Sequence, residues 1–173
     1  MKRLLVIILA LPFVAGAAGD AGKDWKPFHS KEGGYDVLVP GIPLESIQIA
    51  KTGLGTLELK MLLVELKKEN AAFVVSFADF PEGAFKGADD EKRLNFARNG
   101  AVTSAKGRLK AEKKIALGKY PGRELLIEND KGAVRTRVYA VEMRLYQTVV
   151  SGSKAFVHSK DAERFLDSFK LSK

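Results

Sequence analysis

The sequence predicts an α+β fold, a predominantly antiparallel sheet with a central and a C-terminal helix packed on it. Two observations carry this prediction. Short extended segments follow one another through turns rich in glycine, proline and asparagine, and segments joined in this way pair antiparallel. Apolar residues recur at helical spacing twice, near the middle and at the end, so each predicted helix has an apolar face to bury on the sheet.

Four extended segments are expected in the N-terminal half. Residues 35–39 (Tyr-Asp-Val-Leu-Val) alternate like a strand and stop at Pro40, which lacks a backbone donor. The other three segments are residues 44–50, 57–64 and 72–80. The Gly-x-Gly stretch at residues 52–56 is interpreted as a hairpin connection, because a phosphate loop would be followed by a helix rather than a strand.

A central helix is expected after these strands. Either Asp89 or Asp90 can cap it, because a carboxylate accepts hydrogen bonds from the free amides of the first turn. Its apolar residues at helical spacing are Leu94, Ala97, Ala101 and Val102. Gly107 lies beyond its predicted end.

The C-terminal half returns to hairpins and ends in a helix. A strand near residues 115–117 leads to residues 120–123 (Tyr-Pro-Gly-Arg), where proline and glycine occupy the central positions of a predicted type II turn. Further strands are expected over residues 124–128, 134–141 and 144–151. Ser159 can cap the last helix. The apolar stripe of that helix consists of Ala162, Phe165, Leu166 and Phe169.

Two segments resemble a known group of proteins. Residues 35–40 (Tyr-Asp-Val-Leu-Val-Pro) are similar to the opening strand and proline of the Mog1/PsbP-like α/β/α sandwich, and residues 165–171 (Phe-Leu-Asp-Ser-Phe-Lys-Leu) to its closing helix. The resemblance implies this fold and a binding or assembly role without shared catalytic residues. Residues 120–125 and 144–147 are also similar to uncharacterised secreted bacterial proteins, a likeness that implies no activity.

The first residues have the order of a secretory signal peptide. Lys2 and Arg3 precede an apolar run over residues 4–14, which is shorter than the roughly 20 residues of a membrane span. Small residues follow, and cleavage is expected after Ala17 or Ala18. The predicted parts are a signal peptide at residues 1–18, a flexible leader at 19–24 and a single α+β domain at 25–173. We therefore expect an exported, periplasmic or extracellular product that has no integral membrane anchor.

Composition narrows the classes of partner. The chain has no cysteine, so we expect neither disulfides nor lipid attachment through an N-terminal cysteine. Its net charge is +8, which favours contact with anionic surfaces or ligands, although an unspecialised basic surface explains the same charge. The lysine-rich groups lack interleaved aromatic residues, so nucleic acid is not a predicted partner.

The most suggestive constellation lies on the last predicted hairpin. If Glu142 and Met143 form a two-residue turn, one face of the hairpin carries Arg135, Arg137, Tyr139, Arg144 and Tyr146. Guanidinium groups beside two phenols form a candidate site for a carboxylate, phosphate or sulfated sugar. The structural alternative is an aromatic cross-strand pair with arginines stacked on it. The opposite face of the hairpin carries Val134, Val138, Ala140, Leu145 and Val149 and is predicted to be the better core.

No catalytic residue, metal site or cofactor is predicted. The two histidines, His29 and His158, are far apart in sequence, and no Gly-x-Ser-x-Gly turn is present. Asp79 and Glu124 are the carboxylates best placed for acid–base chemistry. Asp79 precedes Phe80 and Pro81, however, so a turn or capping role is the simpler prediction.

These observations favour a non-catalytic binding or interaction module whose partner is an unknown envelope protein or an anionic ligand. The alternative is an envelope hydrolase whose site is assembled from dispersed residues. A third possibility is a structural protein that assembles with itself.

Overall fold

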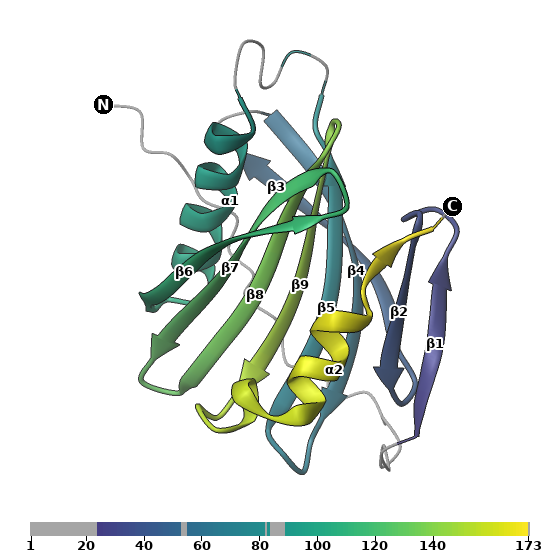
Figure 1. The fold of residues 1–173 in the computed structure, drawn as a ribbon, viewed down its shortest axis with the longest axis vertical. Helices are drawn as coiled ribbons and strands as arrows, with labels where there is room; N and C mark the ends of the chain where they lie inside the picture. Colours follow the sequence, from purple (N-terminus) through teal and green to yellow (C-terminus); the bar gives the residue numbers. More distant parts are fainter. Residues whose placement is uncertain (1–23, 53–54, 82, 84–88, 173) are drawn as a thin grey trace.

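The computed structural model describes residues 24–52, 55–81, 83 and 89–172, which form two antiparallel sheets, two α-helices and a short 3-10 helix (Figure 1). The predicted signal peptide and almost all of the predicted leader lie outside these residues. Residues 53 and 54 of the predicted hairpin connection also lie outside them, although their neighbours Thr52 and Gly55 pair.

The strands divide into a small and a large sheet. The small sheet has the order β1-β2-β10 and consists of β1 (Trp25–Ser30), β2 (Tyr35–Pro40) and β10 (Lys170–Leu171). The large sheet has the order β3-β4-β5-β9-β8-β7-β6. Its strands are β3 (Leu44–Thr52), β4 (Gly55–Leu66), β5 (Ala71–Asp79), β6 (Arg108–Leu117), β7 (Tyr120–Asn129), β8 (Gly132–Val141) and β9 (Arg144–Gly152).

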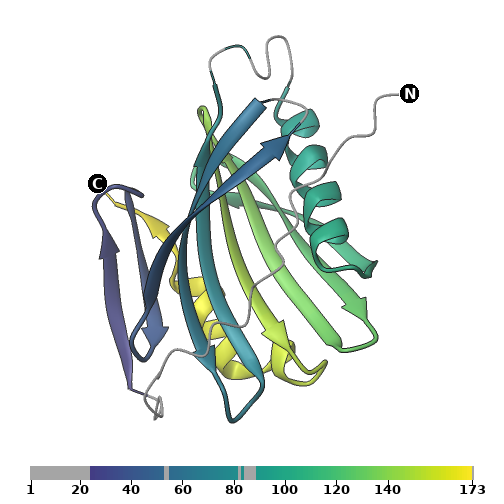
Figure 2. The same cartoon turned by 180° about the vertical axis from the view of Figure 1, so that it is seen from behind.

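The two α-helices lie on opposite faces of the large sheet. Helix α1 (Asp90–Ser104) contacts β7 and β8, and Figure 2 shows it lying over that face. Helix α2 (Lys160–Ser168), preceded by the 3-10 helix η1 (Phe156–His158), contacts β9 and also β2 of the small sheet. Helix α2 therefore lies between the two sheets. The predicted α+β fold, with its central and its C-terminal helix, is confirmed.

Both helix caps are those that the sequence predicts. Asp89 Oδ1 accepts a hydrogen bond from the Lys92 amide at 2.9 Å, and Ser159 Oγ accepts one from the Ala162 amide at 3.2 Å. Each side chain satisfies an amide that the first turn leaves without a helical partner. The helices therefore begin where local chemistry places them.

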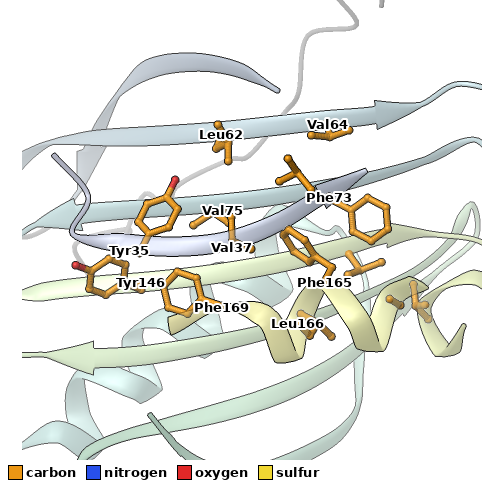
Figure 3. Close-up of a cluster of buried hydrophobic side chains, with 14 of the residues drawn as sticks. Tyr35, Val37, Leu62, Val64, Phe73, Val75, Tyr146, Phe165, Leu166 and Phe169 are labelled. Atoms are coloured by element: carbon orange, nitrogen blue, oxygen red, sulfur yellow. The ribbon is translucent and has the colours of Figure 1, made fainter. Parts of the chain in front are cut away.

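The main hydrophobic core lies between the large sheet, α2 and the small sheet (Figure 3). Phe165 of α2 is 1% exposed, and its ring centroid lies 4.9 Å from that of Phe73 on β5. Phe169 follows α2, and its ring lies 5.4 Å from that of Tyr35 on β2. Aromatic pairs at these separations contribute beyond their buried area. The aromatic residues of α2 and its C-terminal end thus join the two sheets.

Both faces of the β8–β9 hairpin are buried, which corrects one expectation. The apolar face, with Val138 and Ala140, packs against Leu94 and Ala97 of α1, as a core face should. The opposite face, which carries Tyr139, belongs to the larger core around α2. The prediction that the apolar face is the better core was wrong, because α2 and the small sheet cover the tyrosine face.

Two further expectations differ from the structure along β6 and β7. Strand β6 begins at Arg108 rather than near residue 115, and its first seven residues are exposed, so they lack the alternation that marks a half-buried strand. The predicted type II turn at residues 120–123 is absent from the described β6–β7 hairpin, because Pro121 and Gly122 pair with β6 inside strand β7. Gly118 instead makes the turn, with φ at +59°.

Gly122 is expected to resist substitution. A Cβ there would lie 2.5 Å from Cδ1 of Tyr139 and 2.6 Å from the Val138 carbonyl oxygen, so Gly122→Ala should lower the free energy of unfolding by about 1–3 kcal/mol. The control is Gly100→Ala in α1, where the new methyl group meets nothing within 4 Å beyond its chain neighbours and the backbone of its own helix, and a gain of about 0.5–1 kcal/mol is expected. Urea unfolding measures both. Equal changes in the free energy of unfolding for the two variants would contradict the close contact of Gly122 with Tyr139 and Val138.

Candidate functional site

The five predicted site residues do share one face of the large sheet. Glu142 and Met143 form the two-residue connection between β8 and β9, with Val141 opposite Arg144 and Tyr139 opposite Tyr146. Glu142 adopts a left-handed conformation with φ at +52°, which a tight hairpin needs and which asparagine or glycine more often supplies. The remaining members of the set, Arg135 and Arg137, follow at alternate positions of β8.

Arg135 and Arg137 share one buried carboxylate. Glu124 of β7 accepts a hydrogen bond from Nη2 of Arg135 at 2.9 Å through Oε1, and one from Nε of Arg137 at 2.6 Å through Oε2. Each arginine also reaches α2, Arg135 at Glu163 and Arg137 at Asp167, the latter at 2.8 Å. The side chains of both arginines and of Glu124 are at most 14% exposed. This network ties β7 and β8 to α2.

The protonation states of this network follow from its contacts. Burial raises the pKa of the Glu124 carboxyl, but hydrogen bonds from Arg137 and Lys113 outweigh burial and leave the pKa below its ordinary value. Burial likewise lowers the pKa of Arg137, and the hydrogen bonds to Glu124 and Asp167 raise it above its ordinary value. Glu124 is therefore a charged structural partner, and this geometry gives it no role as a general acid.

Arg144 joins the large sheet to the turn of the β1–β2 hairpin. Its Nε and Nη2 atoms contact the two carboxylate oxygens of Asp79 at 2.5 and 2.7 Å, a bidentate pair across β5 and β9. Its Nη1 atom donates to the Gly33 carbonyl at 3.1 Å. The hydrogen bond from Arg144 lowers the pKa of the Asp79 carboxyl. The predicted turn or capping role of Asp79 is thus replaced by a cross-strand ion pair.

Each guanidinium group of the predicted anionic site therefore contacts a carboxylate of this chain. Tyr139 and Tyr146 are each 4% exposed and belong to the main core. An external anion would compete first with Glu163 and Asp167, whose side chains are 46% and 63% exposed. The binding of an anionic ligand at these residues stays a prediction, and the ion pairs of the chain account for the arginines without it.

The Tyr146 hydroxyl should contribute measurably to stability. It donates to the Gly33 carbonyl at 2.6 Å in a buried position, and Tyr146→Phe leaves that oxygen with one hydrogen bond fewer. We expect a loss of about 1–2 kcal/mol in the free energy of unfolding. The matched control is Tyr120→Phe, whose hydroxyl makes an exposed 3.2 Å contact with Glu142 and should change stability by less than about 0.5 kcal/mol. Denaturant unfolding measures both variants. Equal losses of stability in Tyr146→Phe and Tyr120→Phe would show that the buried hydrogen bond of Tyr146 does not contribute.

A serine, a histidine and an aspartate meet on the small sheet, which matters for the hydrolase alternative. Asp36 Oδ1 lies 2.8 Å from Nδ1 of His29, and the Ser172 hydroxyl lies 3.4 Å from the same Nδ1 and 3.2 Å from Asp36 Oδ2. A serine nucleophile must face the other ring nitrogen, Nε2, so that the histidine can take its proton. The hydrogen bond from His29 lowers the pKa of Asp36. The group therefore lacks the arrangement of a catalytic triad.

The part of the chain that the structure describes contains neither a metal-binding cluster nor a helix that could span a membrane. No group of three histidine, aspartate or glutamate side chains there is placed to hold a metal ion. None of the helices within the same residues combines the length and the apolar character that crossing a membrane requires.

A group of exposed apolar side chains that the contacts of the described residues do not explain lies on β3. Three large apolar side chains of this strand are 59–61% exposed, namely Leu44, Ile47 and Ile49. We call these three residues the apolar β3 edge. Ile42, just before the strand, is 88% exposed. Among the described strands β3 pairs only with β4, so it forms one border of the large sheet. The strand itself was predicted from the sequence. Its position at a border depends on which strands pair, and no local signal in the sequence reports that.

Comparison with known proteins identifies the fold. No model of a known protein family matches the sequence, and no curated protein matches it. The structure is similar to the solution structure of cyanobacterial PsbP (CyanoP) from Synechocystis sp. PCC 6803, with a TM-score of 0.54 and 13% identity over 91% of this chain and 98% of that chain. A protein of unknown function from Pseudomonas aeruginosa has a TM-score of 0.44 and 15% identity over 80% of this chain and 90% of that one. The fold is PsbP-like, as the resemblance in the sequence implies.

Proposed function

We propose that this chain is an exported, non-catalytic protein-binding module of the cell envelope, and that its binding surface is the apolar β3 edge. One observation carries the proposal: three large apolar side chains lie more than half exposed on a strand whose outer edge has no strand partner among the described residues. Complete burial of such a side chain is worth about 1.5–3 kcal/mol, so a partner that covers the three gains substantial free energy.

The chemistry of the other candidate surfaces supports this choice. The arginines of the β8–β9 hairpin already have carboxylate partners, whereas the apolar β3 edge has no covering element in the described chain. The hydrolase alternative receives less support, because Ser172 contacts Nδ1 of His29 rather than Nε2.

Export is tested by N-terminal sequencing of the protein recovered from the envelope or the medium. We expect the exported protein to begin at Ala18 or Gly19, because the small residues at positions 15–18 follow a short apolar run. Substitution of Ala17 and Ala18 by lysine should block processing and leave the uncleaved form in the cell. An exported protein that begins at Met1 would contradict this part of the proposal.

Binding is tested by chemical crosslinking and capture from the envelope, with the exported protein as bait. We expect the wild type to retain a specific protein, and the double variant Ile47→Lys/Ile49→Lys to lose it, because two charges on the strand cannot be buried without partners. The control is Leu109→Lys on β6, the opposite border of the sheet, where the residue is 37% exposed. Retention of the same protein by all three baits, or by none, would overturn the proposal.

A further inference from the structure

We propose that the partner of the apolar β3 edge is a second copy of this chain, and that the two β3 strands pair antiparallel about Gln48. The inference rests on the proposed function, since it uses the same surface and names its occupant. It is carried by a comparison between the two borders of the large sheet and by the register that the residues of β3 allow.

The two borders of the sheet differ in how they are protected. Strand β6 has a register irregularity between Leu109 and Ala111, and its exposed positions include Arg108 and Lys110. Bulges and positive charges of this kind prevent edge-to-edge pairing in natural sheets. Strand β3 pairs with β4 without a shift from Leu44 to Thr52, so its outer backbone groups form a regular row that no bulge interrupts.

The exposed isoleucines of β3 lie together on one face. The register with β4 places Ile47 opposite Lys60 and Ile49 opposite Glu58, on the face of the sheet that also carries α2. Strand β3 is the first strand in the order of the large sheet and therefore forms its border on this side. A strand added at this border would therefore meet both a free row of backbone groups and two apolar side chains.

One register brings together both the isoleucines and the oppositely charged residues of β3. Antiparallel pairing about Gln48 sets Ile47 of each copy opposite Ile49 of the other, which brings four isoleucines into one cluster. It also sets Glu45 opposite residue 51, which is a lysine in the sequence, so residues of unlike charge stand opposite each other at both ends. A shift of one residue would place the isoleucines of the two copies on opposite faces. A shift of two would leave only one isoleucine pair and set the other isoleucines opposite residue 45 or 51.

The first test measures association of the purified exported protein by light scattering and sedimentation over a concentration series. We expect the wild type and Leu109→Lys to approach twice the monomer mass with the same dissociation constant. Ile47→Lys/Ile49→Lys should raise that constant by at least about tenfold while circular dichroism shows an unchanged fold. A wild type that stays monomeric at every concentration would overturn the inference, as would a dimer that the double variant leaves intact.

A charge exchange tests the register. Glu45→Lys and Lys51→Glu should each weaken the dimer by about threefold or more, because each places like charges opposite each other, and the combined variant should restore wild-type affinity. Failure of the combined variant to restore it would overturn pairing about Gln48. A monomer that still captures a different protein through β3 overturns this inference and leaves the proposed function standing, whereas a monomer that captures nothing overturns both.

Discussion

Phe165→Ala is expected to lower the free energy of unfolding by about 3–5 kcal/mol, the range for truncation of a fully buried aromatic side chain. Phe165 is 1% exposed, and α2 holds it between the two sheets against Phe73. Its loss leaves a cavity that rigid strands on both sides cannot close. Urea unfolding, followed by tryptophan fluorescence and far-ultraviolet circular dichroism, measures the change.

The matched control for this variant lies on the same helix. Lys160 is exposed at the start of α2, and Lys160→Ala should change stability by less than about 0.5 kcal/mol. A small domain has only about 5–15 kcal/mol of stability, so Phe165→Leu, which keeps most of the volume, provides a second and milder measurement. A loss below about 1 kcal/mol for Phe165→Ala would contradict the placement of α2 between the sheets.

Glu124→Gln should be the most damaging substitution that changes a charge without changing size. The carboxylate serves Arg135 and Arg137 at once and is about 10% exposed, so its neutralisation leaves two buried guanidinium groups short of negative charge. Breaking a buried pair in this way costs about 3–5 kcal/mol when one partner is removed, and we expect about 2–4 kcal/mol here because Glu163 and Asp167 remain.

Glu163→Gln is the control, because Arg135 contacts both Glu124 and Glu163. The Glu163 side chain is 46% exposed, where solvent screens the pair, and its substitution should cost less than about 1 kcal/mol. Chemical denaturation of both variants at neutral pH measures the difference. Equal costs would show that Glu124 is not the centre of the network.

The pH dependence of the same variants gives an independent check. The pKa of Glu124 is lower in the folded protein than its ordinary value of 4.5, so the unfolded chain binds the proton more readily. Its stabilising contribution is complete above that ordinary value and is lost as the pH falls through the folded pKa. The stability difference between wild type and Glu124→Gln should therefore shrink below pH 4.5. If the stability difference between wild type and Glu124→Gln stayed constant down to acid pH, the lowered pKa of Glu124 in the folded protein would be contradicted.

Local features of the sequence were sufficient for most elements of the fold. The alternation over residues 35–39, the apolar run of β5 and the capping residues Asp89 and Ser159 all depend on neighbours within a few positions. The pairing of Tyr139 with Tyr146 was predicted as well, because a two-residue turn sets the register of the hairpin that it closes.

The failed expectations share a physical cause. Strand β6 is exposed along most of its length, so it carries no apolar alternation. Gly122 pairs inside strand β7, where the Tyr139 ring leaves no room for a side chain. Asp79 has its partner 65 positions away, on β9. These contacts cannot be predicted from the residues that are adjacent in sequence.

For this chain, neighbouring residues were enough to establish the order of most strands and of both helices, the helix caps and the face on which the three arginines lie. Long-range packing established the rest. The β5–β9 pairing brings Asp79 to Arg144, and the docking of α2 brings Glu163 and Asp167 to the other two arginines. The strand order leaves β3 at a border of the large sheet. The reason is that turns and caps depend on energies between near neighbours, whereas strand order and ion pairing depend on segments that meet only after the chain has folded.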